Sequence, residues 1–409
     1  MASAAVGGYS ARRAPIISLL TANVVSLTGS TLSALAVPWF VLITTGSAAK
    51  TGITGAVSIL PVFIAGVFGG TLVDRLGFKR TSVLADLASG CAIALIPILY
   101  LTVGLAFWEL LLLLFVARLL SEPGDTGRRS LTPDVAGLAD MPLERANSLY
   151  SSAFSFSNLL GPVLAGVLIA AIGASNVLFV DAATFVVSAA LIGLFLPDER
   201  ATRGASERRG TYFADLREGF VVLRQNKAIL YVALAAALAN FTGVALFVVI
   251  LPVYATKVLG GSVDLGLVIG ADGAGALAGA LLYGTFARRL PKRATFIGAF
   301  MMAGVAMMWM TALPGVVVVM ALMLISGLAT GPLNPMLQTV LQERIPQGLL
   351  GRVFGLVGAV AVVAAPLGAL SAGVLLELGG LRLTIFLDTG LLLVVALVLF
   401  LMPALRELD

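Results

Sequence analysis

The feature that most constrains this chain is a series of long apolar segments separated by short polar loops. A helix that crosses a bilayer needs about 20 mostly apolar residues, and hydrophobic residues make up 59% of the chain. Charged residues make up only 11%, against about 25% in soluble domains. We therefore expect an all-α membrane protein with twelve transmembrane helices. They cover residues 15–45, 53–73, 81–103, 106–122, 144–171, 176–196, 228–255, 265–287, 294–312, 315–338, 352–378 and 381–402.

The positions of lysine and arginine predict how the chain lies in the membrane. Only Lys50, Lys257 and Arg382 fall on one side of the expected helices, and nearly all other cations fall on the opposite side. Cytoplasmic loops carry an excess of lysine and arginine. Both termini are therefore predicted to be cytoplasmic, in a bacterial inner (cytoplasmic) membrane. The same distribution accounts for the pI of 9.6, so we expect no nucleic-acid partner.

One long polar stretch, residues 197–227, interrupts the apolar pattern. We interpret it as a cytoplasmic linker between an N-terminal six-helix bundle, residues 1–196, and a C-terminal six-helix bundle, residues 228–409. Its later part, residues 212–225, could form an amphipathic helix on the membrane surface.

An internal repeat supports this division. Pro38 matches Pro252 at an offset of 214 residues, and Asp181 matches Asp388 at an offset of 207. Gly161, Gly166 and Gly173 match Gly368, Gly373 and Gly380 at the same offset of 207. A deletion of about seven residues near the loop between helices 10 and 11 explains the change of offset. The repeat predicts two pseudo-symmetric six-helix bundles.

A short loop between expected helices 2 and 3 has the residues of a conformational gate. Its glycines allow close helix approach and a tight turn, and its charged groups could form contacts that exist only when the cytoplasmic side is closed. The alternative is an ordinary basic cytoplasmic loop with a turn glycine. The gate candidates are Gly70, Asp74, Arg75, Gly77, Lys79 and Arg80. Their spacing resembles the signature of the major facilitator family, which implies that substrate binds between two halves near the bilayer midplane.

The resemblance extends over nearly the whole chain. The stretches 35–39, 45–48, 59–61, 327–334 and 351–353 are similar to the drug:proton antiporter group of this family, which includes macrolide-efflux proteins and enterobactin exporters. The segments at 85–86 and 403–409 are most similar to mycobacterial tetracycline and aminoglycoside exporters.

Expected helix 5 carries part of the antiporter motif of this group. Gly161, Pro162 and Gly166 match the motif, whereas Ser157 stands at its first glycine position and Ala165 at a later one.

Ionisable residues inside membrane spans are functional candidates by default. Asp272 lies among small residues with no cation nearby in the sequence. Burial without a partner disfavours the charged carboxylate, so Asp272 could bind and release a proton or contact substrate. Alternatively, it lies near the outer mouth and faces water.

Four further charged residues are candidates for proton coupling. Asp181 and Asp388 are favoured as structural residues. Asp86 could pair with a cytoplasmic-side arginine in the gate or be structural. Arg118 resembles the helix 4 arginine of proton-coupled facilitators, where it could promote proton release from a carboxyl group; the alternatives are a static ion pair or a side chain that extends toward the cytoplasm.

Sparse amide side chains mark the expected substrate cavity: Asn23, Asn158, Asn240, Asn334 and Gln338. Each could contact substrate or form an ordinary interhelical hydrogen bond. A largely apolar cavity with few polar groups favours amphiphilic compounds over sugars or phosphates.

The sequence therefore predicts a monomeric secondary transporter that exports amphiphilic drugs in exchange for protons by alternating access. Its partners are a small amphiphilic substrate, protons and membrane lipid. A lysophospholipid flippase or a siderophore exporter on the same scaffold remains open, whereas a membrane enzyme or sensor lacks support. The chain has no histidine and one cysteine, and we expect no metal site, no cofactor and no enzymatic activity.

Overall fold

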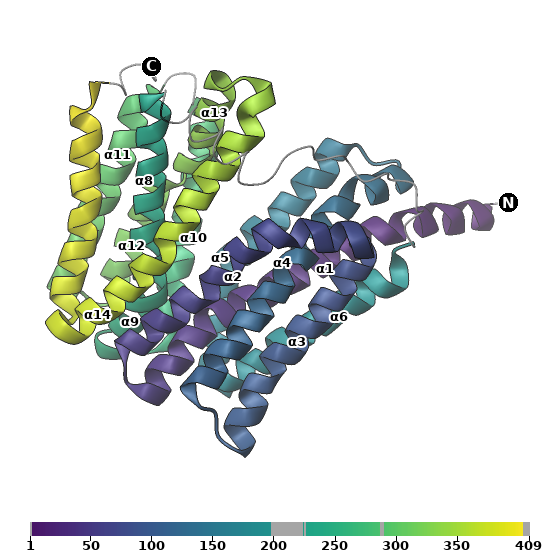
Figure 1. The fold of residues 1–409 in the computed structure, drawn as a ribbon, viewed down its shortest axis with the longest axis horizontal. Helices are drawn as coiled ribbons and strands as arrows, with labels where there is room; N and C mark the ends of the chain where they lie inside the picture. Colours follow the sequence, from purple (N-terminus) through teal and green to yellow (C-terminus); the bar gives the residue numbers. More distant parts are fainter. Residues whose placement is uncertain (1, 198–223, 225, 287–289, 404–409) are drawn as a thin grey trace. The chain divides into compact units, whose positions relative to one another are not determined.

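The fold is known from a computed structural model, which describes residues 2–197, 224, 226–286 and 290–403. The predicted linker and its amphipathic segment lie almost entirely outside these residues. Every element in the described residues is helical (Figure 1).

The first part of the chain forms six helices joined by short turns. Gly77 between the second and third helices has φ 82°, and Gly173 between the fifth and sixth has φ 85°. Glycine adopts this left-handed backbone without the steric cost that a Cβ brings, so the chain can reverse within one residue. The helices are α1 (Ala2–Thr45), α2 (Ala48–Leu76), α3 (Phe78–Thr102), α4 (Phe107–Leu138), α5 (Leu143–Ile172) and α6 (Ala174–Phe195).

The second part contains more interrupted helices. A π-helical turn, η1 (Ala245–Ile250), joins α8 (Lys227–Val244) to α9 (Leu251–Lys257), and α14 (Gln347–Leu401) bends sharply at Gly380, which has φ 73° (Figure 1, yellow). Gly380 is the repeat counterpart of Gly173, and both have left-handed backbone. The remaining elements are α10 (Ser262–Phe286), α11 (Lys292–Met308), the 3₁₀ turn η3 (Trp309–Ala312), α12 (Val316–Thr330) and α13 (Leu333–Arg344).

The fourth helix differs from its predicted length. The apolar pattern places its end near residue 122, but α4 continues to Leu138 and contains Pro123 and Pro133. Arg128, expected in a loop, therefore lies inside the helix. Its polar continuation stays helical because its charged groups find partners on neighbouring helices, as described below.

Ten helical segments among the described residues are long and apolar enough to cross a membrane, so the chain is a multi-pass membrane protein. α4 is not among the ten, and it carries Glu109, Arg118 and Glu122 within its apolar part. α14 counts once although Gly380 divides it. The number twelve and the cytoplasmic position of both termini stay predictions.

The chain forms two compact units. The N-terminal unit comprises Met1–Val37 and Leu60–Arg208, and the C-terminal unit comprises Pro38–Ile59 and Arg209–Asp409. The end of α1 and the start of α2 thus pack with the second half of the chain.

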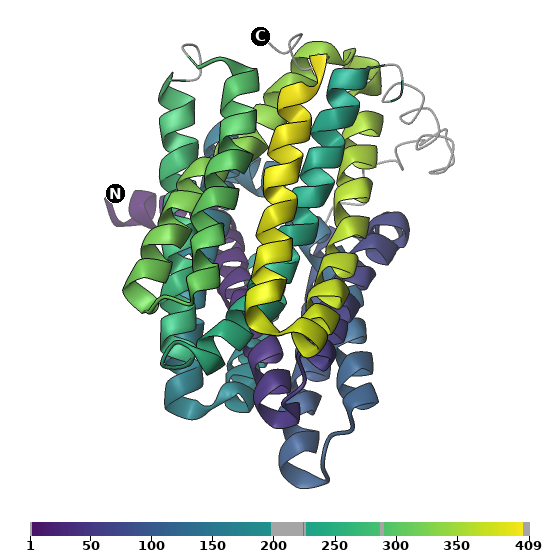
Figure 2. The same cartoon turned by 90° about the vertical axis from the view of Figure 1, so that its left-hand side faces the viewer.

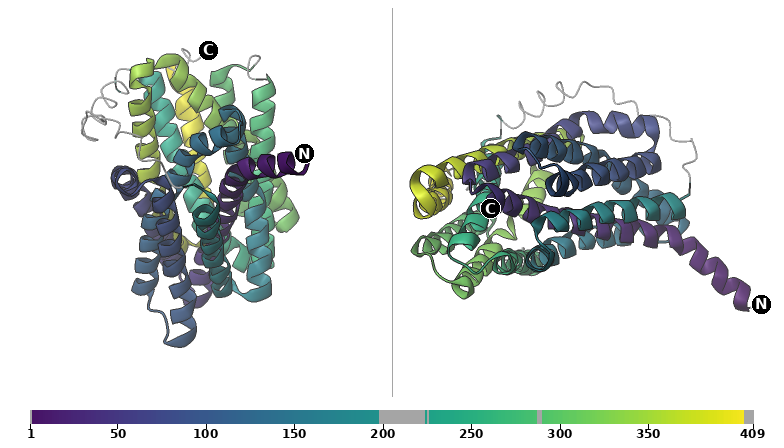
Figure 3. Two further views of the ribbon diagram at one scale, coloured as in Figure 1. Left: turned by 90° about the vertical axis from the view of Figure 1, so that its right-hand side faces the viewer. Right: turned by 90° about the horizontal axis from the view of Figure 1, so that it is seen from below.

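Pairwise helix packing builds each unit. In the C-terminal unit, α8 runs along α14 (Figure 2, teal and yellow), and α10 packs on α12. In the N-terminal unit, α3 packs on α4 and α6, and a short loop joins α3 to α4 (Figure 3).

Candidate functional site

The C-terminal unit contains a cavity of about 350 Å³. Its wall is mostly apolar, and two aspartates, two asparagines, two threonines and one serine interrupt it. None of the lining residues is basic. The lining residues are Val232, Ala236, Ala239, Asn240, Thr242, Gly243, Leu246, Phe247, Asp272, Ala276, Phe296, Phe300, Ala303, Met307, Ser326, Thr330, Gly331, Leu333, Asn334, Leu337, Asp388 and Leu392.

Asp272 reaches this cavity through close packing of α10 on α12. A Cβ at Gly327 would lie 2.1 Å from the backbone oxygen of Asp272, and one at Gly275 would lie 2.2 Å from that of Leu324. Gly279 and Gly331 make equally close approaches one turn further along. Only glycine permits this separation of the helix backbones, so the glycine pairs fix where Asp272 enters the cavity wall.

Asp388 reaches the cavity from the second part of α14. Asp388 is 8% exposed, and it has no hydrogen-bond or ion-pair partner among the described residues. A buried carboxyl group without a partner is energetically costly. Asp388 was favoured as a structural residue, but it faces the same cavity as Asp272.

Two of the five predicted amides line the cavity, namely Asn240 on α8 and Asn334 on α13. Gln338 is exposed one turn beyond Asn334 and is not part of the lining. Asn158 is exposed on α5 and donates to the backbone oxygen of Phe154 at 3.0 Å. Asn23 is buried in the N-terminal unit, and both of its side-chain polar atoms lack hydrogen-bond partners.

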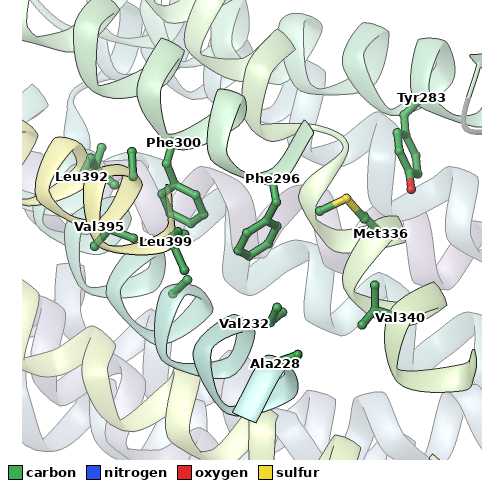
Figure 4. Packing of buried hydrophobic residues seen from close by; sticks show 12 residues of the cluster. Ala228, Val232, Tyr283, Phe296, Phe300, Met336, Val340, Leu392, Val395 and Leu399 are labelled. Atoms are coloured by element: carbon green, nitrogen blue, oxygen red, sulfur yellow. The ribbon is translucent and has the colours of Figure 1, made fainter. Parts of the chain in front are cut away.

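The apolar wall of the cavity continues into a tightly packed core (Figure 4). Phe296 and Phe300 on α11 meet edge to face, with ring centroids 5.4 Å apart. Val232 and Leu392 belong both to the core cluster and to the cavity lining. The π-helical turn next to the cavity contributes Leu246 and Phe247. Such turns often occur at functional sites.

The N-terminal unit holds a buried ionic network. The guanidinium of Arg128 on α4 donates to Asp86 on α3 at 2.6 Å and also pairs with Asp125. Asp86 and Arg128 are 0% and 1% exposed, and Ser188 on α6 donates to Asp86 at 2.6 Å. Asp86 thus pairs with Arg128, one of the cations expected on the cytoplasmic side.

Asp181 on α6 is also buried, but it has donors. Ser33 on α1 donates a hydrogen bond to its carboxylate, and Thr184 donates at 3.4 Å. Arg118 lies half-buried on α4. The structure therefore brings Asp272 and Asp388 to one cavity of the C-terminal unit.

The predicted gate loop is described in part. Gly70 and Asp74 lie within α2, but their side-chain surroundings are outside the described part of the chain. Gly77 forms the turn to α3, and Lys79 donates to the backbone oxygen of Leu196 at 2.7 Å. Arg75 and Arg80 are exposed.

The helix 5 motif packs α5 on α1. A Cβ at Gly161 would lie 2.5 Å from Cγ2 of Thr31, and Ser157, one turn earlier, hydrogen-bonds Thr28 at 3.1 Å. Pro162 and Gly166 are buried beside Gly161. Ser157, which departs from the motif, therefore supplies a contact that glycine could not.

A polar contact links the start of α2 to α14 within the C-terminal unit. Glu377 accepts hydrogen bonds from the Ser47 hydroxyl at 2.5 Å and from the Ala49 backbone N–H at 3.1 Å. A carboxylate at a helix N-terminus is favoured by the unpaired N–H groups there.

Three features of the structure were not predicted from the sequence. The pairs Gly275/Gly279 and Gly327/Gly331 have the GxxxG spacing that marks close membrane helix packing, so this signal was present. Arg128 was visible only as a loop cation, because the apolar pattern ends before it. Nothing local in the sequence marks the cavity position of Asp388.

Comparisons with known proteins agree with this architecture. The model of the Major Facilitator Superfamily matches residues 19–365 and 264–408. The multidrug efflux pump Tap of Mycolicibacterium fortuitum is 31% identical over 97% of this chain and 98% of its own length. Macrolide efflux protein A of Streptococcus pyogenes is 25% identical over 94% and 95% of the two chains. The resemblance drawn from the sequence is confirmed.

Solved structures support the fold. A crystal structure of a variant of the nucleoside transporter NupG has a TM-score of 0.81 at 10% identity, and the match covers 94% of this chain and 98% of the other. Identity this low establishes the fold alone.

Proposed function

Because this chain belongs to the Major Facilitator Superfamily, we propose that it exports amphiphilic drugs in exchange for protons by alternating access. The relatives named for multidrug and macrolide efflux match nearly its whole length. We place it in the bacterial cytoplasmic membrane, where it acts as a monomer. Transport of this kind needs no enzymatic step and no bound cofactor.

The observation that carries this proposal is the cavity of the C-terminal unit. Its volume of about 350 Å³ is in the range of small-molecule pockets. Aromatic and aliphatic side chains such as Phe247, Phe300 and Met307 form most of its wall. Two amides, Asn240 and Asn334, and three hydroxyl side chains supply the neutral polar groups of the wall. A mostly apolar wall with scattered polar groups suits amphiphilic compounds of varied shape better than sugars.

Asp272 is the group we assign to proton coupling. It lies in the cavity wall without a hydrogen-bond or ion-pair partner among the described residues. Its carboxyl group can therefore be in one of two states. It is neutral when it carries a proton, and it is available as a carboxylate when a substrate enters the cavity. A proton that crosses the membrane gains about 2.3 kcal/mol for each 100 mV of membrane potential, and this can drive export without ATP.

Alternating access requires that contacts between the two repeats separate on one side of the membrane. The contact of Glu377 with Ser47 and Ala49 joins the second repeat to the first. Close backbone approaches of Gly52 to Ala369 and of Gly373 to Ala48 accompany it. We expect these contacts to separate in the state that releases substrate on their side of the membrane.

The test is proton movement driven by drugs in proteoliposomes that contain a pH-sensitive dye. Tetracycline, macrolide and aminoglycoside compounds are added to wild-type protein and to Asp272→Asn. We expect drug-dependent proton flux in wild type, and flux reduced to the level of empty liposomes in the variant.

Asp181→Asn is the matched control, because Asp181 is a buried aspartate of the other unit. Flux that survives Asp272→Asn would assign proton coupling to another carboxylate. Absence of drug-linked flux under any gradient would contradict drug antiport, and transport of lysophospholipid or of a siderophore would then be measured in the same liposomes.

A further inference from the structure

The repeat makes Asp181 and Asp388 equivalent in sequence, yet their surroundings differ. Ser33 donates to Asp181 from α1. The residue 214 positions later, at the offset that relates Pro38 to Pro252, is Phe247. Phe247 cannot donate a hydrogen bond, and it lines the same cavity as Asp388. The second repeat therefore has the acid without the donor that the first repeat supplies.

The space around the two aspartates differs in the same way. A Cβ at Gly29 would lie 1.9 Å from Oγ1 of Thr184 and 2.6 Å from Oδ1 of Asp181. Its counterpart Gly243 lines the cavity, and a Cβ there would meet no heavy atom within 4 Å. The position is filled by protein in the first repeat and open in the second.

An acid in an open apolar cavity calls for a positive ligand. Asp388 is more than nine-tenths buried and lacks a protein partner among the described residues. An uncompensated charge in such a place is strongly unfavourable, and a cation that enters would remove that penalty. Asp272 adds a second carboxyl group to the same wall, and no lining residue is basic.

The remaining wall suits a cation that carries apolar groups. Phe247, Phe296 and Phe300 present aromatic rings to the cavity, and the face of an aromatic ring attracts cations. Aliphatic side chains and Met307 complete a surface for hydrocarbon substituents.

From these contacts we infer that the C-terminal cavity is a binding site for lipophilic organic cations and that Asp388 is the carboxylate that contacts their positive charge. This inference rests on the proposed function in that the ligand is the exported substrate. It assigns Asp388 to substrate recognition and leaves Asp272 for coupling.

The test is binding, which requires neither transport nor a proton gradient. Radiolabelled tetraphenylphosphonium is a suitable probe, because its charge does not depend on pH. Its affinity is measured on purified full-length protein in nanodiscs for wild type, Asp388→Asn, Asp388→Glu and the control Asp181→Asn. Triphenylphosphine oxide, which is neutral and similar in shape, is measured as a competitor.

We expect Asp388→Asn to weaken tetraphenylphosphonium binding by about tenfold or more, as expected when a buried charge partner is removed. Asp388→Glu should retain most of the affinity, and Asp181→Asn should bind as wild type does. The neutral competitor should bind more weakly than the cation to wild type and equally well to wild type and Asp388→Asn.

A second measurement on the wild-type protein avoids any effect of substitution on folding. Dicyclohexylcarbodiimide modifies carboxyl groups in apolar surroundings, and mass spectrometry locates the product. Tetraphenylphosphonium should protect Asp388 from modification. Unchanged modification of Asp388 at saturating cation, equal affinity for the neutral compound, or wild-type binding by Asp388→Asn would each overturn the inference. Binding that is lost with Asp388 while drug-linked proton flux is absent would support the site and contradict proton antiport.

Discussion

Some repeat-related positions carry polar side chains in the N-terminal unit and apolar side chains in the C-terminal unit. In the N-terminal unit, Asp86 is buried and bonded to Arg128 and Ser188. The residues related to Asp86 and Ser188 by the repeat offsets are Phe300 and Val395, which belong to the apolar core of the C-terminal unit (Figure 4). At these related positions the N-terminal unit has a polar network, whereas the C-terminal unit has apolar packing next to a cavity. Repeat symmetry preserves the helices but not the chemistry between them.

The two environments differ in how many ligand shapes they can accommodate. A buried ionic network has strict geometric demands, because each charge must keep its partner. An apolar wall with isolated acids tolerates ligands of many shapes. We therefore expect substitutions in the N-terminal network to affect folding and substitutions in the cavity to affect binding.

The largest expected effect breaks the polar network. Arg128→Met leaves the carboxylates of Asp86 and Asp125 without their cation and should lower the free energy of unfolding by about 3–5 kcal/mol. The double variant Asp86→Leu/Arg128→Met removes the buried pair and should be more stable than Arg128→Met alone. Thermal unfolding of the purified protein in detergent measures both. Equal losses in the single and double variants would show that the charges do not act as a pair.

The next prediction compares Gly29, which is closely packed, with Gly243, which faces open space. Gly29→Ala places a methyl group against Thr184 and Asp181, and this overpacking should cost about 1–3 kcal/mol. Gly243→Ala places the same group in the open cavity and should change the free energy of unfolding by less than about 0.5 kcal/mol. The same unfolding assay applies. A Gly243→Ala variant as unstable as Gly29→Ala would contradict the presence of open space.

A smaller effect concerns the donor to Asp181. Ser33→Ala removes a hydrogen bond to a buried carboxylate while Thr184 remains as a donor. We expect a loss of about 1 kcal/mol in stability and no change in tetraphenylphosphonium affinity. Altered cation binding in Ser33→Ala would mean that the N-terminal unit also takes part in recognition.

The smallest effect is expected at an exposed ion pair of the C-terminal unit. Lys292 on α11 pairs with Glu343 on α13, and their side chains are 26% and 51% exposed. Lys292→Ala should cost at most about 1 kcal/mol, because solvent screens exposed pairs. A loss of unfolding free energy as large as that of Arg128→Met would contradict the expectation that buried ion pairs affect stability more than exposed ones in this protein.

Much of the architecture could be predicted from the sequence, because the bilayer imposes long apolar helices and the positions of glycine mark their turns. Gly173 and Gly380 were recognised as a repeat pair, and both have left-handed backbone. The extent of α4 could not be predicted, because its second part depends on partners from other helices. Arg128 is buried beside Asp86 of α3, and Asp125 pairs with it from the preceding turn of α4.

The candidate site was predictable only in part. Asp272 stood out because it is an acid within an apolar segment, and Asn240 and Asn334 were chosen as rare amides; all three line the cavity. Asp388 had the same sequence signal as Asp181, and the two were given the same structural role. The difference between them depends on Ser33 and Phe247, which lie more than a hundred residues away in sequence.

The most direct test of the C-terminal cavity as the substrate site measures whether the cavity is open and holds substrate. The chain has a single cysteine, Cys91, so Cys91→Ser gives a cysteine-free background. Ala236→Cys then places a thiol in the cavity wall, and Ala22→Cys places one at the repeat-related position, which is fully buried in the N-terminal unit. Labelling rates with a small membrane-permeant thiol reagent are measured with and without tetraphenylphosphonium.

We expect that Ala236→Cys reacts readily, that tetraphenylphosphonium slows its reaction, and that Ala22→Cys reacts slowly under both conditions. Equal rates at the two positions, or a rate at Ala236→Cys that saturating cation leaves unchanged, would contradict the assignment of the C-terminal cavity as the substrate site.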